Sequence, residues 1–112
     1  DVNIRFIKLD IEGGELPALR GGSKLLERYR PVISLEIGEE AYSVYGVKAA
    51  DIAEFFYSRG YRIADTLGNR FETPEKFLIS ENLDGMRDYV AIHSEDGTQA
   101  AILNALTEQV QI

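Results

Sequence analysis

The chain has 112 residues, with 12 Lys and Arg against 19 Asp and Glu, which gives a formal net charge of −7 at pH 7. A share of 45% hydrophobic residues, 10% of the chain being aromatic, predicts a globular domain and excludes a disordered acidic tail. The acidic balance disfavours nucleic-acid binding, the apolar runs are too short to cross a membrane, and the lack of cysteine excludes disulfides, thiol nucleophiles and Cys-ligated zinc.

The first third of the chain predicts a strand followed by two short helices. Residues 4–10 form an apolar run that ends at Gly13-Gly14, as a buried strand ending in a loop would. A helix is expected to begin near Glu15, with Pro17 in its first turn, and to be interrupted at Gly21-Gly22. Ser23 is expected to cap a second helix that runs through Tyr29.

The middle of the chain carries the strongest local signals. Pro31 ends the second helix, and the apolar run 32–37 predicts a second strand. Residues 48–59 place apolar side chains at helical spacing, and Gly60 follows in the position of a left-handed cap. A third strand is expected over 61–65.

The last third is the harder part to interpret. A turn at Gly68-Asn69 leads to a short extended segment, 70–72, and Phe77–Ile79 is also expected to be extended. Residues 89–93 predict a fourth core strand, and residues 98–108 a final helix.

Strands and helices therefore alternate along a single domain, residues 1–112, without repeats or a linker. Near-continuous apolar strands of this kind favour an α/β fold with a mostly parallel sheet and helices on both faces.

Two groups of carboxylates follow the first two predicted strands. Ligands of open α/β sheets bind at the carboxyl ends of the strands, and a right-handed crossover makes these two strands neighbours. The groups should therefore face one another and could bind a cation or hold one carboxyl at a raised pKa for proton abstraction. Asp10 and Glu36 are the best placed, whereas Glu15 suits the helix dipole and the others suit solvated loops. The groups are Asp10, Glu12 and Glu15, and Glu36, Glu39 and Glu40.

Other candidates carry weaker signals. His93 lies within an apolar strand, where a lone histidine is usually structural. Tyr42 and Tyr45 could stack on a ring substrate or pack over the end of the sheet. Lys8, within an apolar strand, either faces an edge or pairs with a carboxylate.

The segment from Phe6 to Glu15, Phe-Ile-Lys-Leu-Asp-Ile-Glu-Gly-Gly-Glu, resembles the signature of the FkbM family of S-adenosylmethionine-dependent methyltransferases. Leu19-Arg20-Gly21 and the segment 30–36, Arg-Pro-Val-Ile-Ser-Leu-Glu, continue the resemblance in order and spacing. From Gly60-Tyr61 onward it is looser.

The resemblance implies a Rossmann-like methyltransferase sheet of seven strands whose last strand is antiparallel and inserted between the fifth and sixth. Residues 4–10, 32–37, 61–65 and 89–93 would be strands four to seven. The chain would then be a partial domain, the C-terminal half, lacking the N-terminal strands that hold most of the cofactor.

By the same resemblance, the chain would be part of an enzyme that transfers a methyl group from S-adenosylmethionine to a hydroxyl of a small molecule or sugar. Asp10 would be the base and lie at the fringe of the cofactor site, and Glu12 and Glu36 would position the acceptor or a cation. No metal is assigned, and a cytoplasmic location is expected. As part of a longer protein, the chain would be inactive alone.

Two other interpretations remain open from the residues. The chain could be a non-catalytic remnant or assembly module that forms a homo-oligomer through an unpaired sheet edge at residues 4–10. A metal-dependent hydrolase using Asp10, Glu12 and Glu36 is weaker, because no histidine accompanies them.

Overall fold

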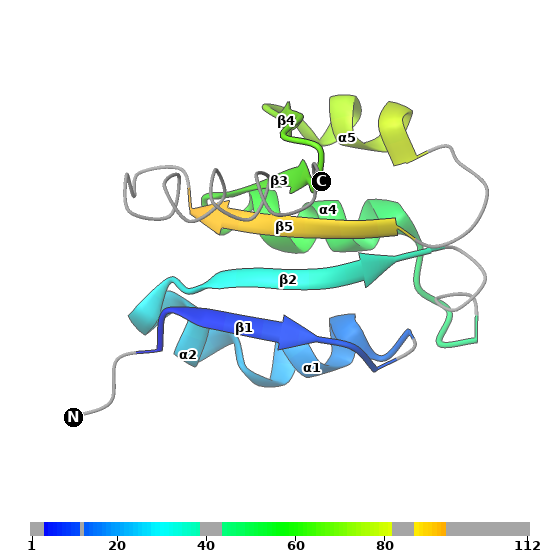
Figure 1. Cartoon of the computed structure of the whole chain (residues 1–112). Helices are drawn as coiled ribbons and strands as arrows, with labels where there is room; N and C mark the ends of the chain where they lie inside the picture. The colour runs from blue at the N-terminus through cyan, green and yellow to red at the C-terminus, as the bar shows by residue number, and fades with distance from the viewer. Residues whose placement is uncertain (1–3, 12, 39–43, 82–86, 94–112) are drawn as a thin grey trace.

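The computed structural model describes residues 4–11, 13–38, 44–81 and 87–93. Its five-stranded mixed sheet has the order β1-β2-β5-β3-β4. The strands lie side by side in Figure 1, with β1 at one edge and β4 at the other. They are β1 (Phe6–Leu9), β2 (Val32–Ile37), β3 (Tyr61–Asp65), β4 (Arg70–Phe71) and β5 (Arg87–His93).

The pairing directions correct the expectation of a mostly parallel sheet. Only β1 and β2 pair in parallel among the described strands, and the β2–β5, β5–β3 and β3–β4 pairs are antiparallel. The expected antiparallel strand between the second and third is confirmed, since β5 pairs with both β2 and β3. The apolar pattern of one strand reports its burial and not the direction of its neighbour, which is why that pattern alone favoured a mostly parallel sheet.

The described helices follow the predicted order with one addition. They are α1 (Glu15–Gly21), α2 (Ser23–Tyr29), α4 (Ala49–Tyr57) and α5 (Pro74–Glu81). Gly22 lies between α1 and α2 as expected, but Ser23 is the first residue of α2 and makes no side-chain cap. Gly60 has a φ of 83°, in agreement with the expected left-handed position.

Helix α5 replaces the extended segment expected at Phe77–Ile79, so that prediction was wrong. Pro74 begins the helix, and the Thr73 hydroxyl accepts a hydrogen bond from the Lys76 N–H at 3.2 Å. Phe77 is fully buried, whereas Ile79 is 78% exposed, so the apolar run points to different sides of a helix. A run of three apolar residues cannot by itself distinguish a strand from a helix.

A single large core lies on one face of the sheet. Figure 1 shows α1, α2 and α4 on the same side, and α5 joins this core through Phe77. The opposite face carries a smaller cluster of Val32, Ala64, Val90 and Ile92. Helices on both faces are therefore not found in the described part of the chain, and the predicted helix 98–108 lies outside it.

Strand β1 differs from the buried strand that residues 4–10 predict. Its side chains alternate between exposed and half-buried, and Phe6 is 44% exposed. Within the described ranges, β1 pairs with β2 alone. None of the helices in these ranges is long and apolar enough to span a bilayer.

Candidate active site

Carboxylates from three strands meet at one end of the sheet. Strands β1 and β2 run in parallel with Leu9 opposite Leu35, so Asp10 and Glu36 occupy the same end. Asp88 enters from the antiparallel strand β5, directly opposite Glu36. We call Asp10, Glu15, Glu36 and Asp88 the acidic edge. The sequence placed Asp10 and Glu36 together correctly as strand-end neighbours, but it did not identify Asp88.

The acidic edge changes the proton affinity of Glu36. Burial is the main cause that raises the pKa of this carboxyl above its ordinary value, followed by the negative charges of Asp88, Asp10 and Glu15. Lys8, exposed on β1, lowers it and only partly offsets these effects. Glu36 therefore takes up a proton more readily than a solvated glutamate does.

We expect Glu36→Gln to stabilise the chain at pH 7. A carboxyl whose pKa is raised in the folded state binds more protons there than in the unfolded state, so its contribution to stability falls as pH rises through that range. The gain from Glu36→Gln should therefore shrink as pH falls towards the ordinary glutamate pKa. Urea unfolding at a series of pH values measures this.

Glu54→Gln provides the matched control for that experiment. Glu54 is exposed on α4, so the substitution removes the same charge away from the acidic edge. A gain from Glu36→Gln that is no larger than that from Glu54→Gln, or that is unchanged by pH, would contradict the raised pKa.

Glu15 has a structural role beyond the one that the sequence predicted. Its side chain is completely buried, and its carboxylate accepts hydrogen bonds from the N–H groups of Ile11 and Gly13, both at 2.9 Å. The Gly14 N–H also donates to the Ile11 carbonyl at 3.2 Å, and Gly13 has a φ of 104°. Glu15 thus fixes the loop that follows Asp10, in addition to lying at the positive end of α1.

The remaining candidates are only partly described. Glu12, Glu39, Glu40 and Tyr42 lie outside the described residues. Tyr45 is exposed, and its hydroxyl lies beside Gly14, since a Cβ built there would be 3.7 Å from it. Within the described ranges, no group of three or more acidic or histidine side chains is arranged to hold a metal ion.

His93 lies far from the acidic edge, at the other end of β5. Its side chain is 7% exposed, and its ring packs edge-on against Tyr61 with centroids 5.5 Å apart. It is therefore no part of the acidic site.

A scan against protein-family models matches residues 1–63 to the methyltransferase FkbM domain. The chain belongs to the FkbM methyltransferase family. The resemblance seen in the residue pattern is thereby confirmed, and the general activity of the family is that of a methyltransferase. No curated protein and no solved structure matches the chain.

The FkbM match covers most of the acidic edge. Asp10, Glu15 and Glu36 lie within the matched residues, whereas Asp88 follows them. The matched segment runs from before β1 to Ile63 in β3, and so includes the parallel β1–β2 pair that sets the site.

Proposed function

We propose that the chain is the acceptor-facing half of an S-adenosylmethionine-dependent O-methyltransferase. The observation that carries the proposal is the meeting of Asp10, Glu36 and Asp88 at one end of the sheet of an FkbM domain, where burial first and the neighbouring negative charges second raise the pKa of Glu36. Perturbed carboxyls of this kind are typical of sites that handle protons or cations. The acceptor is proposed to be a hydroxyl of a small molecule or a sugar, and the location to be cytoplasmic.

The negative charge of the acidic edge complements the positive charge of S-adenosylmethionine. S-adenosylmethionine supplies, when bound, a methyl group on a positively charged sulfur. Carboxylates attract that cation and accept hydrogen bonds from ribose hydroxyls, so Asp10 at the end of β1 suits the fringe of a cofactor site. The main cofactor site is proposed to lie on preceding strands of a longer protein.

Four of the acidic residues then have a role in the proposed reaction. The Asp10 carboxylate takes the proton of the acceptor hydroxyl as the acceptor oxygen bonds to the methyl carbon and the carbon–sulfur bond breaks. Glu12 and Glu36 position the acceptor or a cation beside it. Glu15 holds the backbone that follows Asp10 through its bonds to Ile11 and Gly13.

Calorimetric titration with S-adenosylmethionine tests the cofactor proposal. We expect binding to the chain extended by its natural preceding segment and little binding to the 112-residue chain alone. Micromolar binding by the chain alone would contradict the partial-domain proposal. Absence of binding to both forms would contradict the use of this cofactor.

The variant Asp10→Asn tests the base in the extended protein. Methyl transfer from isotopically labelled cofactor should fall about 10²–10⁴-fold, the usual contribution of a general base, while cofactor binding is largely kept. Glu54→Gln is the control, because Glu54 is exposed on α4 and away from the acidic edge. Unchanged turnover of Asp10→Asn would remove this residue as the base.

An assembly module is the second candidate function, and the edge strand β1 favours it. Half of its side chains are exposed, including Phe6, and an edge with unpaired backbone groups can recruit a strand from a second copy. Sedimentation of the chain as a dimer, together with no cofactor binding by either form, would favour this candidate over the enzyme.

A further inference from the structure

A cavity of about 270 Å³ lies at the end of the sheet opposite the acidic edge. It is bounded by the end of α2, the turn between α4 and β3, and the end of β5. Tyr61 and His93, which line it, are register partners at the first residue of β3 and the last of β5. Six residues of β2 separate the two ends of the sheet, a distance of about 17 Å. The cavity is therefore a second location, apart from the proposed methyl-transfer site.

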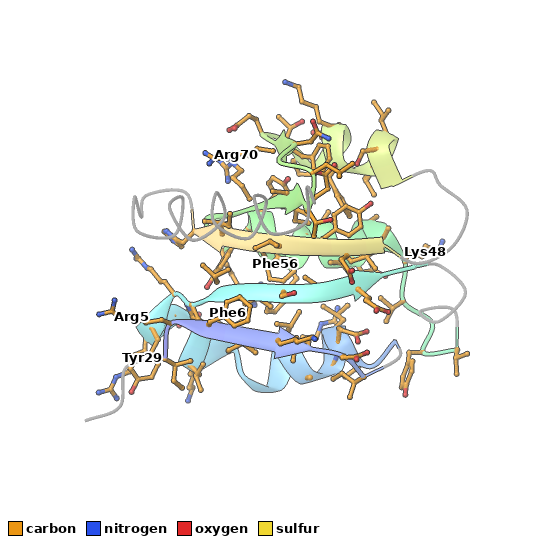
Figure 2. The ribbon with its side chains drawn as sticks, viewed as in Figure 1. Arg5, Phe6, Tyr29, Lys48, Phe56 and Arg70 are labelled. Atoms are coloured by element: carbon orange, nitrogen blue, oxygen red, sulfur yellow. The ribbon has the colours of Figure 1, made fainter. Side chains whose placement is uncertain are left out.

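The charged groups that line this cavity are mainly basic. Arg30 and Arg59 are the cationic lining residues, Glu27 is the acidic one among the described lining residues, and His93 adds an imidazole. This distribution is the reverse of that at the acidic edge. Figure 2 shows Arg5 and Tyr29 at this same end of the sheet, and Lys48 at the other.

Arg59 is held in place without a carboxylate partner among the described residues. Its guanidinium lies 3.9 Å from the centre of the Phe55 ring, and its Nη1 donates to the Phe55 carbonyl at 3.1 Å and to the Ser58 hydroxyl at 3.3 Å. Its buried Nε donates to no acceptor in the described part of the chain. A guanidinium that is positioned by neutral acceptors and has no carboxylate partner among the described residues has capacity for an anion.

Contacts within the fold hold side chains in the walls of the cavity. The Tyr61 hydroxyl donates to the Pro31 carbonyl at 2.8 Å, and the Tyr61 ring packs against His93. Gly60 lies so close to His93 that a Cβ there would be 2.8 Å from Nε2. Side chains that are fixed before binding lose little conformational entropy when a ligand arrives.

We propose that this cavity, which we call the Arg59 cavity, binds a phosphate group, either free or on a small metabolite. The planar fork of the Arg59 guanidinium matches the oxygens of phosphate, and Arg30 adds a second positive charge to the lining from another element. The volume is close to the lower limit of small-molecule pockets, so it suits a phosphate with little else attached. The negative charge of the Glu27 carboxylate opposes the binding of an anion, so removing that charge is expected to strengthen phosphate binding.

Inorganic phosphate is the probe, added to the isotopically labelled chain at constant ionic strength with chloride as the reference salt. We expect saturable changes in the amide resonances of residues 58–61 and 93. Non-saturating changes, or the same changes with chloride, would overturn the proposal. Glycerol phosphate as a second probe distinguishes a site for free phosphate from one for a phosphorylated metabolite by which of them binds more tightly.

Three variants make the test specific. Arg59→Gln should weaken phosphate binding about tenfold or more, as expected for loss of a charged hydrogen-bonding group. Arg28→Gln is the matched control, because Arg28 is exposed on α2, stacks over Tyr29 and does not line the cavity. Glu27→Gln should strengthen binding by removing the opposing charge.

Wild-type affinity in Arg59→Gln would also overturn the proposal. If Arg59→Gln fails to fold, Arg59→Lys replaces it, since lysine keeps the charge but loses the planar fork and should bind phosphate more weakly than the wild type.

Discussion

Replacing Glu15 by alanine is expected to lower the free energy of unfolding by about 3 kcal/mol, because a buried backbone donor is left without its charged acceptor. The Glu15 carboxylate is fully buried and accepts from two backbone N–H groups, of Ile11 and Gly13. Gly13 is buried, so water cannot easily replace the lost acceptor. The loss should be measurable by urea unfolding at neutral pH.

The location of the destabilised residues distinguishes the loss of the Glu15 hydrogen bonds from a general loss of packing. Hydrogen exchange at the amides of Ile11 and Gly13 should accelerate in Glu15→Ala more than exchange in β3. Glu15→Gln should lose less stability, since an amide keeps one acceptor oxygen while its NH₂ faces the other backbone donor. Glu54→Ala, an exposed change on α4, should stay within about 0.5 kcal/mol of the wild type. A similar loss in both alanine variants would contradict the role given to Glu15.

Gly60→Ala is expected to destabilise the chain by about 3 kcal/mol, the sum of backbone strain and overpacking. Gly60 has a φ of 83°, where a side chain is disfavoured, and the added Cβ would lie 2.8 Å from His93 Nε2. The imidazole cannot move away at low cost, because it is buried against Tyr61. Thermal or urea unfolding measures the loss.

Gly21→Ala provides a control of opposite sign. Gly21 is the last residue of α1, and a Cβ there would meet nothing within 4 Å. Alanine restricts the unfolded chain and favours the helix, so this variant should gain up to about 1 kcal/mol. Equal changes in the two variants would show that the left-handed backbone and the contact with His93 have no part in the effect.

The elements with strong local signals were predictable from the sequence. Strand β2 occupies the predicted residues 32–37, and α4 lies within the predicted helix 48–59. Proline, glycine and helical spacing act within a few residues, so they can be read without the fold. The apolar pattern of a strand does not give the direction of its neighbour, so the antiparallel β2–β5 and β5–β3 pairs were expected only from the family resemblance. The antiparallel pairing of β4 with β3 was not predicted.

The part of the candidate site that depends on a single strand–helix–strand crossover was predictable from the sequence. A strand, a helix and a neighbouring parallel strand bring Asp10 and Glu36 to one end, and the sequence contains this order. Asp88 was missed because the predicted strand covered only residues 89–93, whereas β5 begins at Arg87. The Gly-Gly-Glu sequence indicated a turn that leads into a helix at Glu15. The hydrogen bonds from the preceding loop to the Glu15 carboxylate depend on the turn geometry at Gly13, which the sequence pattern does not show.

The Arg59 cavity could not be predicted from local patterns. Its walls come from residues near 30, 60 and 93, which are brought together only when β5 pairs with β3. Each of these residues, taken alone, is ordinary for a helix end or a strand end. A contact between such distant segments has no local sequence signature.

The position of β5 also has a consequence for the order in which the chain folds. Strands β2 and β3 each pair with β5 and are joined in the sheet only through it. During synthesis, β1 and β2 can pair early, and β3 and β4 can form a hairpin, but the two pieces form one sheet only after residue 93 has been made. A contact formed between segments so far apart in the sequence is slow to close. Both ends of the sheet, and the candidate sites that lie there, are therefore complete only after β5 has paired with β2 and β3.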